Sequence, residues 1–206
     1  NVPLKREASY TAFNMNILNR INVCMALLLF VFPQGGESSE AAVLNNVSYK
    51  SDTELEYVEA DQKLVYGDTN PGLQYGLLWL PKEPVTGTTS PLIVLIHGGC
   101  WLNAYDIRHT FPLSSALAEA GYAVWSLEYR RTGDEGGAWP GSFDDIMKGL
   151  EFTSRLESYP VDMIRMVIMG HSAGGHLALL AASEDKNIVA VVGLAAIIDI
   201  VEYSRG

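Results

Sequence analysis

The fold is decided by residues 165–180, which read RMVIMGHSAGGHLALL. Met166–Met169 is a short apolar run with branched side chains, which predicts a buried β-strand. Ala173 opens an apolar helical pattern, and only three residues separate it from the end of that run. Ser172 is therefore expected on a sharp turn from strand to helix. Gly170 and Gly174 on either side let neighbouring backbone approach this turn closely.

The position of Ser172 on this turn favours a role in catalysis. The hydroxyl of Ser172 is expected to project from the carboxyl end of the sheet, where open α/β folds bind ligands. The helix that starts beneath it favours negative charge at its N-terminus. A Gly-x-Ser-x-Gly pattern alone is a modest signal, and an idle serine in a glycine-rich turn is the alternative. The strand directly before and the helix directly after favour a nucleophile.

Strands and helices alternate over much of the chain. This alternation predicts an α/β fold with right-handed crossovers and a mostly parallel sheet that has helices on both faces. The expected strands are Lys63–Tyr66, Tyr75–Leu80, Leu92–Ile96, Tyr122–Leu127, Met166–Met169 and Ile188–Leu194, and the expected helices are Phe111–Ala120, Phe143–Leu156 and Ala173–Ser183.

A second glycine motif follows the strand that ends at Ile96. It reads His97-Gly98-Gly99-Cys100-Trp101. Two glycines leave backbone N–H groups uncovered, and acyl transfer needs such donors where the oxyanion of the tetrahedral intermediate forms. The N–H of Ala173, the residue after the serine, is a further expected donor. The pairing of this loop with the serine turn is more specific than either motif alone.

Composition and charge exclude several classes of function. The chain has 206 residues with 48% hydrophobic content, enough for one globular domain with a core. Its net charge is −10 and it has no cluster of Lys and Arg, so nucleic acid is not an expected partner. His171 and His176 have no thiolate or carboxylate at metal-ligand spacing, and neither a metal nor a cofactor is expected. Cys100 lacks an evident base and is a weak alternative nucleophile.

The N-terminal region has the pattern of an export signal. From Met15, a short basic segment precedes the apolar run Ile21–Phe32, and Ser39-Glu40-Ala41 offers a small-residue cleavage site. We expect residues 1–41 to be upstream residues plus a signal peptide, with secretion or periplasmic export of the domain 42–206. The run is too short for a comfortable membrane span. A buried N-terminal helix is the alternative.

Four motifs together resemble one branch of the α/β-hydrolases. They are the loop 97–101, Tyr129-Arg130-Arg131, Trp139-Pro140-Gly141 and the serine turn 170–177. They resemble the kynurenine formamidase-like and feruloyl-esterase-like branch, over about residues 63–204. The resemblance implies a carboxylesterase that forms an acyl-enzyme on a small-molecule ester or amide. It implies Ser172 as the nucleophile, Gly99, Cys100 and Ala173 as oxyanion donors, and His97, Gly98, Gly170 and Gly174 as structural support.

The sequence departs from this family after the serine. The family order is serine, acidic residue, histidine, but the only histidine after Ser172 is His176, which is expected to face away from it. Asp199 is interpreted as a structural residue at a strand end, with the triad acid as the alternative. We therefore expect a fragment that lacks the C-terminal strands and helices and is inactive by itself. Its strand Ile188–Leu194 is expected to form an uncovered hydrophobic edge.

Other readings stay open at this point. An amidase or exopeptidase is an alternative activity, and a binding protein that has lost the triad is an alternative class. The sequence leaves the oligomeric state undetermined. We expect Arg130 to pair with Asp145, and Glu128 and Asp144 to serve as helix caps or partners of Arg130. Trp101, Tyr129 and Trp139 either line a substrate pocket or pack in the core.

Overall fold

The computed structural model describes residues 49–85 and 87–205, which belong to one compact unit. The expected signal peptide lies outside the described residues. Within them, no helix has both the length and the apolar character needed to cross a membrane.

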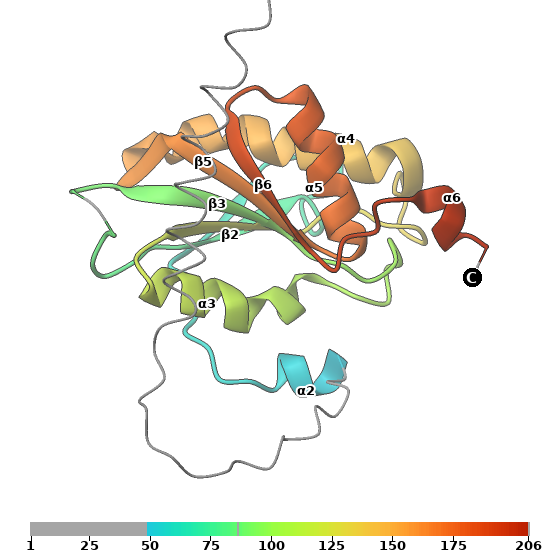
Figure 1. Ribbon diagram of the computed structural model, residues 1–206, viewed down its shortest axis with the longest axis horizontal. Helices are drawn as coiled ribbons and strands as arrows, with labels where there is room; N and C mark the ends of the chain where they lie inside the picture. Colours follow the sequence, from blue (N-terminus) through green and yellow to red (C-terminus); the bar gives the residue numbers. More distant parts are fainter. Residues whose placement is uncertain (1–48, 86, 206) are drawn as a thin grey trace, which may run out of the picture. The chain divides into compact units, whose positions relative to one another are not determined.

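A mixed sheet forms the centre of this unit (Figure 1). Among the described residues it has six strands in the order β1-β2-β4-β3-β5-β6. The last four strands of the chain run parallel, and the first two are antiparallel additions at one side. The strands are β1 (Gln62–Val65), β2 (Tyr75–Trp79), β3 (Ser90–Ile96), β4 (Ala123–Leu127), β5 (Val161–His171) and β6 (Ile188–Leu194).

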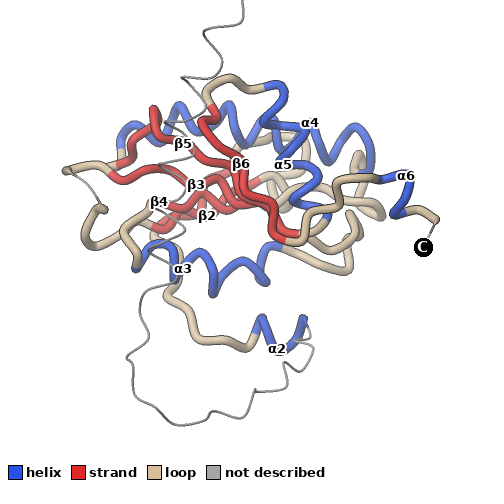
Figure 2. The backbone as a smooth tube through the Cα atoms, in the orientation of Figure 1, coloured by secondary structure: helices blue, strands red, loops and turns tan. Residues whose placement is uncertain are grey.

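Helices cover both faces of this sheet, as the sequence predicts. Helix α3 (Phe111–Glu119) lies against one face, and α4 (Ala138–Glu151) and α5 (Ala173–Glu184) lie against the other (Figures 1 and 2). The α/β-hydrolase type of fold is thereby confirmed for the described part of the chain. Four shorter elements complete it: α2 (Tyr49–Thr53), η1 (Ile107–Thr110), η2 (Phe152–Ser158) and α6 (Ile200–Tyr203).

The parallel register brings three strand ends to one place. Ile96 at the end of β3 pairs with Leu127 of β4 on one side and with Gly170 of β5 on the other. Strands β3 and β4 consist largely of buried residues, because helices cover both of their faces. The residues that follow these strands therefore meet at the carboxyl edge of the sheet, where the site is described below.

Helix α4 differs most from the helix that the sequence predicts. The expected helix Phe143–Leu156 begins earlier, at Ala138, and ends at Glu151, where the tighter turns of η2 take over. A kink at Trp139 (φ −77°, ψ 134°) interrupts its first turn. An amphipathic period identifies the helix body well, but it gives little information about an irregular first turn.

Strand β6 lies at the edge of the sheet and pairs with β5 alone among the described residues. Val189 and Val191 on this strand are exposed. The expected uncovered hydrophobic edge is therefore present in this part of the chain. No charged side chain lies on the strand to discourage pairing with another edge.

Candidate active site

Ser172 is held in a strained backbone conformation between β5 and α5. Its φ of 52° and ψ of −116° lie in a region that costs a non-glycine residue roughly 1–3 kcal/mol. Two contacts from the β6 side hold the turn. The Ser172 N–H donates to the Leu194 carbonyl (2.9 Å), and the Ser172 carbonyl accepts from the Ile197 N–H (3.2 Å). The serine side chain is half-buried.

The glycines beside the serine are needed for close backbone packing. A Cβ on Gly170 would lie 2.2 Å from the Gly174 carbonyl oxygen, and a Cβ on Gly174 would lie 2.3 Å from that of His97. A Cβ on Gly98 would lie 3.2 Å from the Cβ of Ser172 and 2.7 Å from the His171 carbonyl oxygen. The loop after β3 is therefore pressed directly against the serine turn.

This loop has an unusual backbone path. Gly99 (φ 110°), Cys100 (φ 53°) and Trp101 (φ 56°) all have positive φ angles, two of them in residues with side chains. In the part of the chain that the structure describes, the N–H groups of Gly99, Cys100 and Ala173 make no hydrogen bond. These N–H groups are therefore unpaired within the described residues, and their role as oxyanion donors stays a prediction.

His97 is locked into the scaffold below the loop. Its ring is fully buried, with Nε2 3.0 Å from a carboxylate oxygen of Glu128 and Nδ1 2.8 Å from the Gly98 carbonyl oxygen. The ring stacks on Tyr129, whose hydroxyl donates to the His97 carbonyl (2.9 Å). Both ring nitrogens are engaged, so the geometry supports the expected structural role and not a catalytic one.

The Glu128 carboxylate contacts several residues of this scaffold, and its ion-pair partner differs from the one expected from the sequence. The expected pairing with Arg130 is wrong, because the carboxylate instead lies 3.0 Å from Nη1 of Arg131. It also accepts from the N–H groups of Tyr129 (2.9 Å) and Ile107 (3.1 Å). The carboxylate thus joins the loop after β3, the start of η1 and the end of β4. No local pattern around a glutamate at a strand end reveals a partner as distant in sequence as Ile107.

The pairing of Arg130 with Asp145 is confirmed. The guanidinium donates twice to the buried carboxylate, at 2.8 Å from Nε and 2.7 Å from Nη2. The Arg130 N–H adds a third bond of 3.0 Å, and the side chain of Gln74 adds a fourth of 2.6 Å. The neighbouring Asp144 is exposed. Asp145 therefore ties α4 to the ends of β2 and β4.

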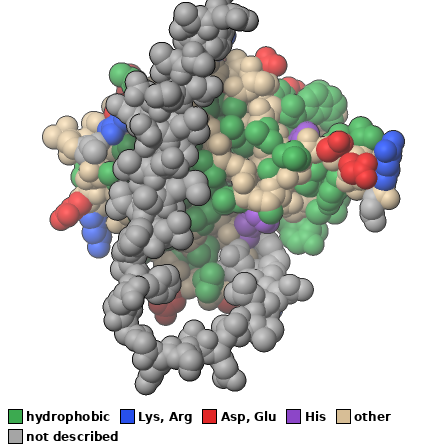
Figure 3. Space-filling model, viewed as in Figure 1, with side chains coloured by type: hydrophobic (Ala, Val, Ile, Leu, Met, Phe, Trp, Pro, Cys, Tyr) green, Lys and Arg blue, Asp and Glu red, His purple; other side chains and the backbone are tan. Residues whose placement is uncertain are grey.

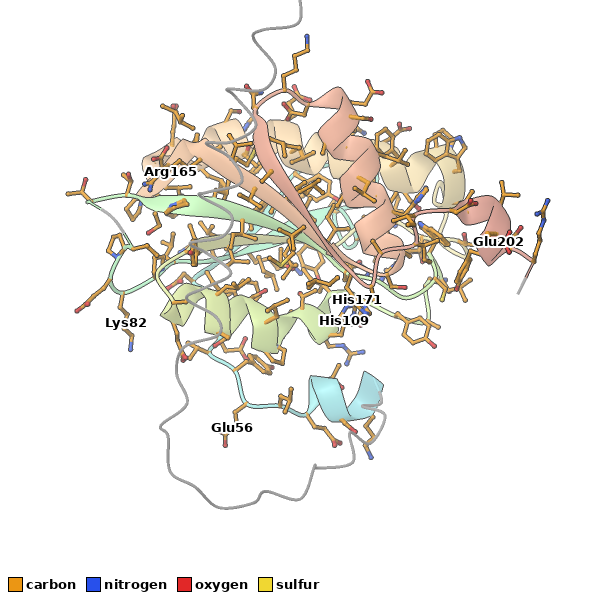
Figure 4. The ribbon with its side chains drawn as sticks, viewed as in Figure 1. Glu56, Lys82, His109, Arg165, His171 and Glu202 are labelled. Atoms are coloured by element: carbon orange, nitrogen blue, oxygen red, sulfur yellow. The ribbon has the colours of Figure 1, made fainter. Side chains whose placement is uncertain are left out.

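His109 is a further residue of the site that the sequence did not indicate. Its Nε2 accepts a long hydrogen bond from the Gly98 N–H (3.4 Å). Its ring makes edge contacts with His97 (5.9 Å between centroids) and His171 (5.5 Å). Figure 4 shows His109 and His171 close together at the end of the sheet. Burial, reinforced by these two histidines, lowers the pKa of His109 to about 4.

This lowered pKa predicts a loss of stability in mild acid. The unfolded chain binds a proton at His109 near pH 6.5, whereas the folded chain does so only near pH 4. Stability should therefore decrease as the pH falls from 6.5 towards 4, by about 2 kcal/mol between pH 7 and pH 5. Urea unfolding at both pH values measures this, and His109→Gln should reduce the difference. If the variant and the wild type lost the same unfolding free energy between pH 7 and pH 5, the assignment to His109 would be wrong.

The side chains of His176 and Asp199 contact groups other than the serine hydroxyl. Nδ1 of His176 lies 3.0 Å from the Ile197 carbonyl oxygen, and its ring meets the edge of Trp101. Asp199 accepts from the N–H groups of Val201 and Glu202 as the N-cap of α6, which supports the structural interpretation. In the described residues, the Ser172 hydroxyl has no hydrogen-bond partner.

A cavity of about 260 Å³ lies between the loop after β3, the start of α4, helix α5 and helix α6. Trp101 and Trp139 both line it, whereas Tyr129 is fully buried and belongs to the core. Figure 3 shows hydrophobic side chains gathered at the α6 end of the molecule. The other main lining side chains are Cys100, His176, Leu177 and Ile200.

Comparisons with known proteins agree with this geometry. The BD-FAE family model matches residues 78–201. The chain is 31% identical over 123 residues to the probable carboxylic ester hydrolase LipM of Mycobacterium tuberculosis, covering 59% of this chain and 28% of LipM. It is 29% identical over 153 residues to esterase LipQ of the same organism, covering 71% of this chain and 35% of LipQ.

A solved structure gives the same result for the fold. Esterase B from Lactobacillus rhamnosis superposes with a TM-score of 0.55 at 27% identity, covering 65% of this chain and 43% of the esterase. The chain spans about a third of the length of LipM and LipQ, at 28% and 35%.

Proposed function

Because the chain belongs to the BD-FAE family, we propose that it forms part of a serine hydrolase that cleaves carboxylic esters, with Ser172 as the nucleophile. The observation that carries this proposal is the strained conformation of Ser172 at φ 52°, pressed against a loop of unpaired N–H groups. The names of LipM and LipQ support the reaction class. The substrate we propose is a small-molecule ester.

The arrangement suggests how the reaction proceeds. The Ser172 oxygen attacks the carbonyl carbon of the ester, and the N–H groups of Gly99, Cys100 and Ala173 stabilise the resulting oxyanion. The oxyanion then collapses, and the alcohol leaves with a proton. Water attacks the acyl-enzyme in the same way and releases the acid. Each attack needs a base that accepts a proton and then returns it.

Three of the four described histidines are poorly placed to act as this base. His97 has both ring nitrogens engaged, His176 is turned to the Ile197 carbonyl, and His109 accepts from Gly98 with a pKa of about 4. We propose that the base is a histidine outside residues 49–205, held by an acidic partner. This matches the family order of serine, acid and histidine.

A fluorophosphonate probe tests the nucleophile and the base together. Such a probe reacts only with a serine whose proton a base removes. We expect full-length protein to be labelled on the peptide that contains Ser172, and the 206-residue chain alone to stay unlabelled. Peptide mass spectrometry locates the adduct. Labelling of another residue would refute Ser172, and Ser172-dependent labelling of the 206-residue chain would refute the external base.

We also propose that the protein is exported. The basic segment, apolar run and small residues from Met15 to Ala41 support this. N-terminal sequencing of the protein from its own cells should give a start near Ala42. A mature N-terminus at Met15 or before it would contradict export by cleavage of this segment.

A further inference from the structure

The peptide group between His97 and Gly98 is held at both of its ends by side chains from other segments. Its carbonyl accepts a hydrogen bond from the Tyr129 hydroxyl (2.9 Å). Its N–H donates to Nε2 of His109 (3.4 Å). This peptide is trans, so its C=O and N–H groups point in opposite directions. Tyr129 and His109 therefore hold the start of the loop from two opposite edges.

The next peptide group, between Gly98 and Gly99, is held at one end only. Nδ1 of His97 lies 2.8 Å from the Gly98 carbonyl oxygen, which can only accept a hydrogen bond. Because this peptide is also trans, the Gly99 N–H points away from that contact. In the described residues the Gly99 N–H has no partner. The side-chain contacts thus end just before the first expected oxyanion donor.

One carboxylate fixes the positions of both imidazoles. An oxygen of Glu128 lies 3.0 Å from Nε2 of His97, and its other oxygen accepts from the Ile107 N–H (3.1 Å). Ile107 is the first residue of η1, the short helix that carries His109. The loop after β3 and the ring that holds its Gly98 N–H are therefore attached to the same side chain.

The hydrogen bond to Gly98 determines where the proton of His109 lies. An N–H group can only donate, so Nε2 must be without a proton. Burial and the neighbouring His97 and His171 lower the pKa of His109 to about 4, so the ring is neutral at pH 7. Its proton then lies on Nδ1, and the Asp106 backbone accepts a hydrogen bond from the ring.

We propose that His109 is a positioning residue that holds the loop with the Gly99 and Cys100 N–H groups by accepting a hydrogen bond from Gly98. It acts through Gly98 and does not contact the substrate. A Cβ on Gly98 would lie 2.7 Å from the His171 carbonyl oxygen, so the loop is in place against the serine turn. The effect on catalysis rests on the proposed function, but the hydrogen bond itself does not.

Two substitutions at His109 separate the acceptor from the bulk of the ring. His109→Phe keeps a ring and removes the acceptor. In the full-length protein it should lower kcat for a short p-nitrophenyl ester by about 10–100-fold, less than the roughly 10²–10³ that follows complete loss of an oxyanion donor. KM should stay within about threefold, because such donors act mainly on the transition state. His109→Gln, whose side-chain oxygen can accept, should keep kcat within about fivefold of wild type.

The next residue provides a control for general loosening of η1. The buried Thr110 hydroxyl donates to the Ile107 carbonyl (2.7 Å) and lies 2.8 Å from the Ser126 hydroxyl. Thr110→Val removes these bonds without changing the acceptor of Gly98. It should lower the free energy of unfolding in urea and leave kcat unchanged. If Thr110→Val and His109→Phe lowered kcat alike, a structural role of η1 would replace the proposal.

Nuclear magnetic resonance tests the hydrogen bond without any reaction. At pH 7, ¹H–¹⁵N correlations should place the proton of His109 on Nδ1, in the signals that disappear in His109→Phe. The Gly98 amide should exchange with deuterated water at least about tenfold faster in His109→Phe than in the wild type. His109→Gln and Thr110→Val should retain most of its protection.

The outcomes separate this proposal from the proposed function. A proton on Nε2 of His109, unchanged Gly98 exchange in His109→Phe, or wild-type kcat in that variant would each overturn the positioning role. If His109→Phe does not fold, the position of the proton and the kcat of His109→Gln still decide. If the proton and the exchange are as expected but the fluorophosphonate does not label full-length protein, the hydrolase proposal is wrong and the hold on Gly98 stands.

Discussion

Replacing Ser172 with alanine should lower the kcat of the full-length protein for a short p-nitrophenyl ester by about a millionfold. The loss is this large because the nucleophile and its base act as a unit, so removing one member removes the covalent route. The N–H groups of Gly99, Cys100 and Ala173 remain in place. They should preserve a residual rate of roughly 10³–10⁴ over the reaction in water.

A serine near the far end of helix α5 provides the control. Ser183 lies near the end of α5, is exposed, and donates to the Leu180 carbonyl (2.6 Å). Ser183→Ala should leave kcat and KM unchanged. A Ser172→Ala protein that keeps more than about a hundredth of wild-type kcat, with contaminating esterase excluded by active-site titration, would show that another group attacks the substrate.

Replacing Asp145 with alanine should destabilise the fold by about 3–5 kcal/mol. The carboxylate is fully buried and accepts four hydrogen bonds from Arg130 and Gln74. Its removal leaves a guanidinium at the base of the site without its partner, and this loss is larger than the net contribution of the pair. Urea unfolding of the wild type and the variant at pH 7 measures the difference.

The next residue is the control for this change. Asp144 has the same side chain but is exposed, so Asp144→Ala should shift stability by less than about 0.5 kcal/mol. The double variant Arg130→Ala/Asp145→Ala should be more stable than the sum of the two single changes indicates, because it leaves no buried unpaired charge. Similar losses for Asp144→Ala and Asp145→Ala would contradict the buried pair.

Local patterns accounted for the sheet and for the serine turn. The apolar run Met166–Met169 lies inside β5, and Ala173 begins α5 as expected. A strand of a parallel sheet with helices on both faces has consecutive apolar residues, so a short segment of sequence is enough to predict it. The Arg130–Asp145 pair could also be predicted, since both residues lie at the ends of expected elements.

Contacts between distant segments could not be read in this way. Glu128 forms its ion pair with Arg131 and not with Arg130. Its carboxylate also contacts His97, Ile107 and Tyr129, and only the folded chain brings these residues together. The proximity of His109 to Gly98 has the same origin. The one-turn helices α2 and α6 were missed because a single turn is too short to show a period.

The pairing of Ile96 in β3 with Gly170 in β5 also has a kinetic consequence. A tight hairpin cannot join parallel strands, and the connection between these two contains β4 and the helices α3 and α4. Pairings between such distant residues form slowly, because the entropy of closing the loop is lost before the contacts are gained. On refolding, helical structure should therefore appear well before the loop with Gly98 reaches Ser172, and competence to bind a ligand should be among the last properties the molecule acquires.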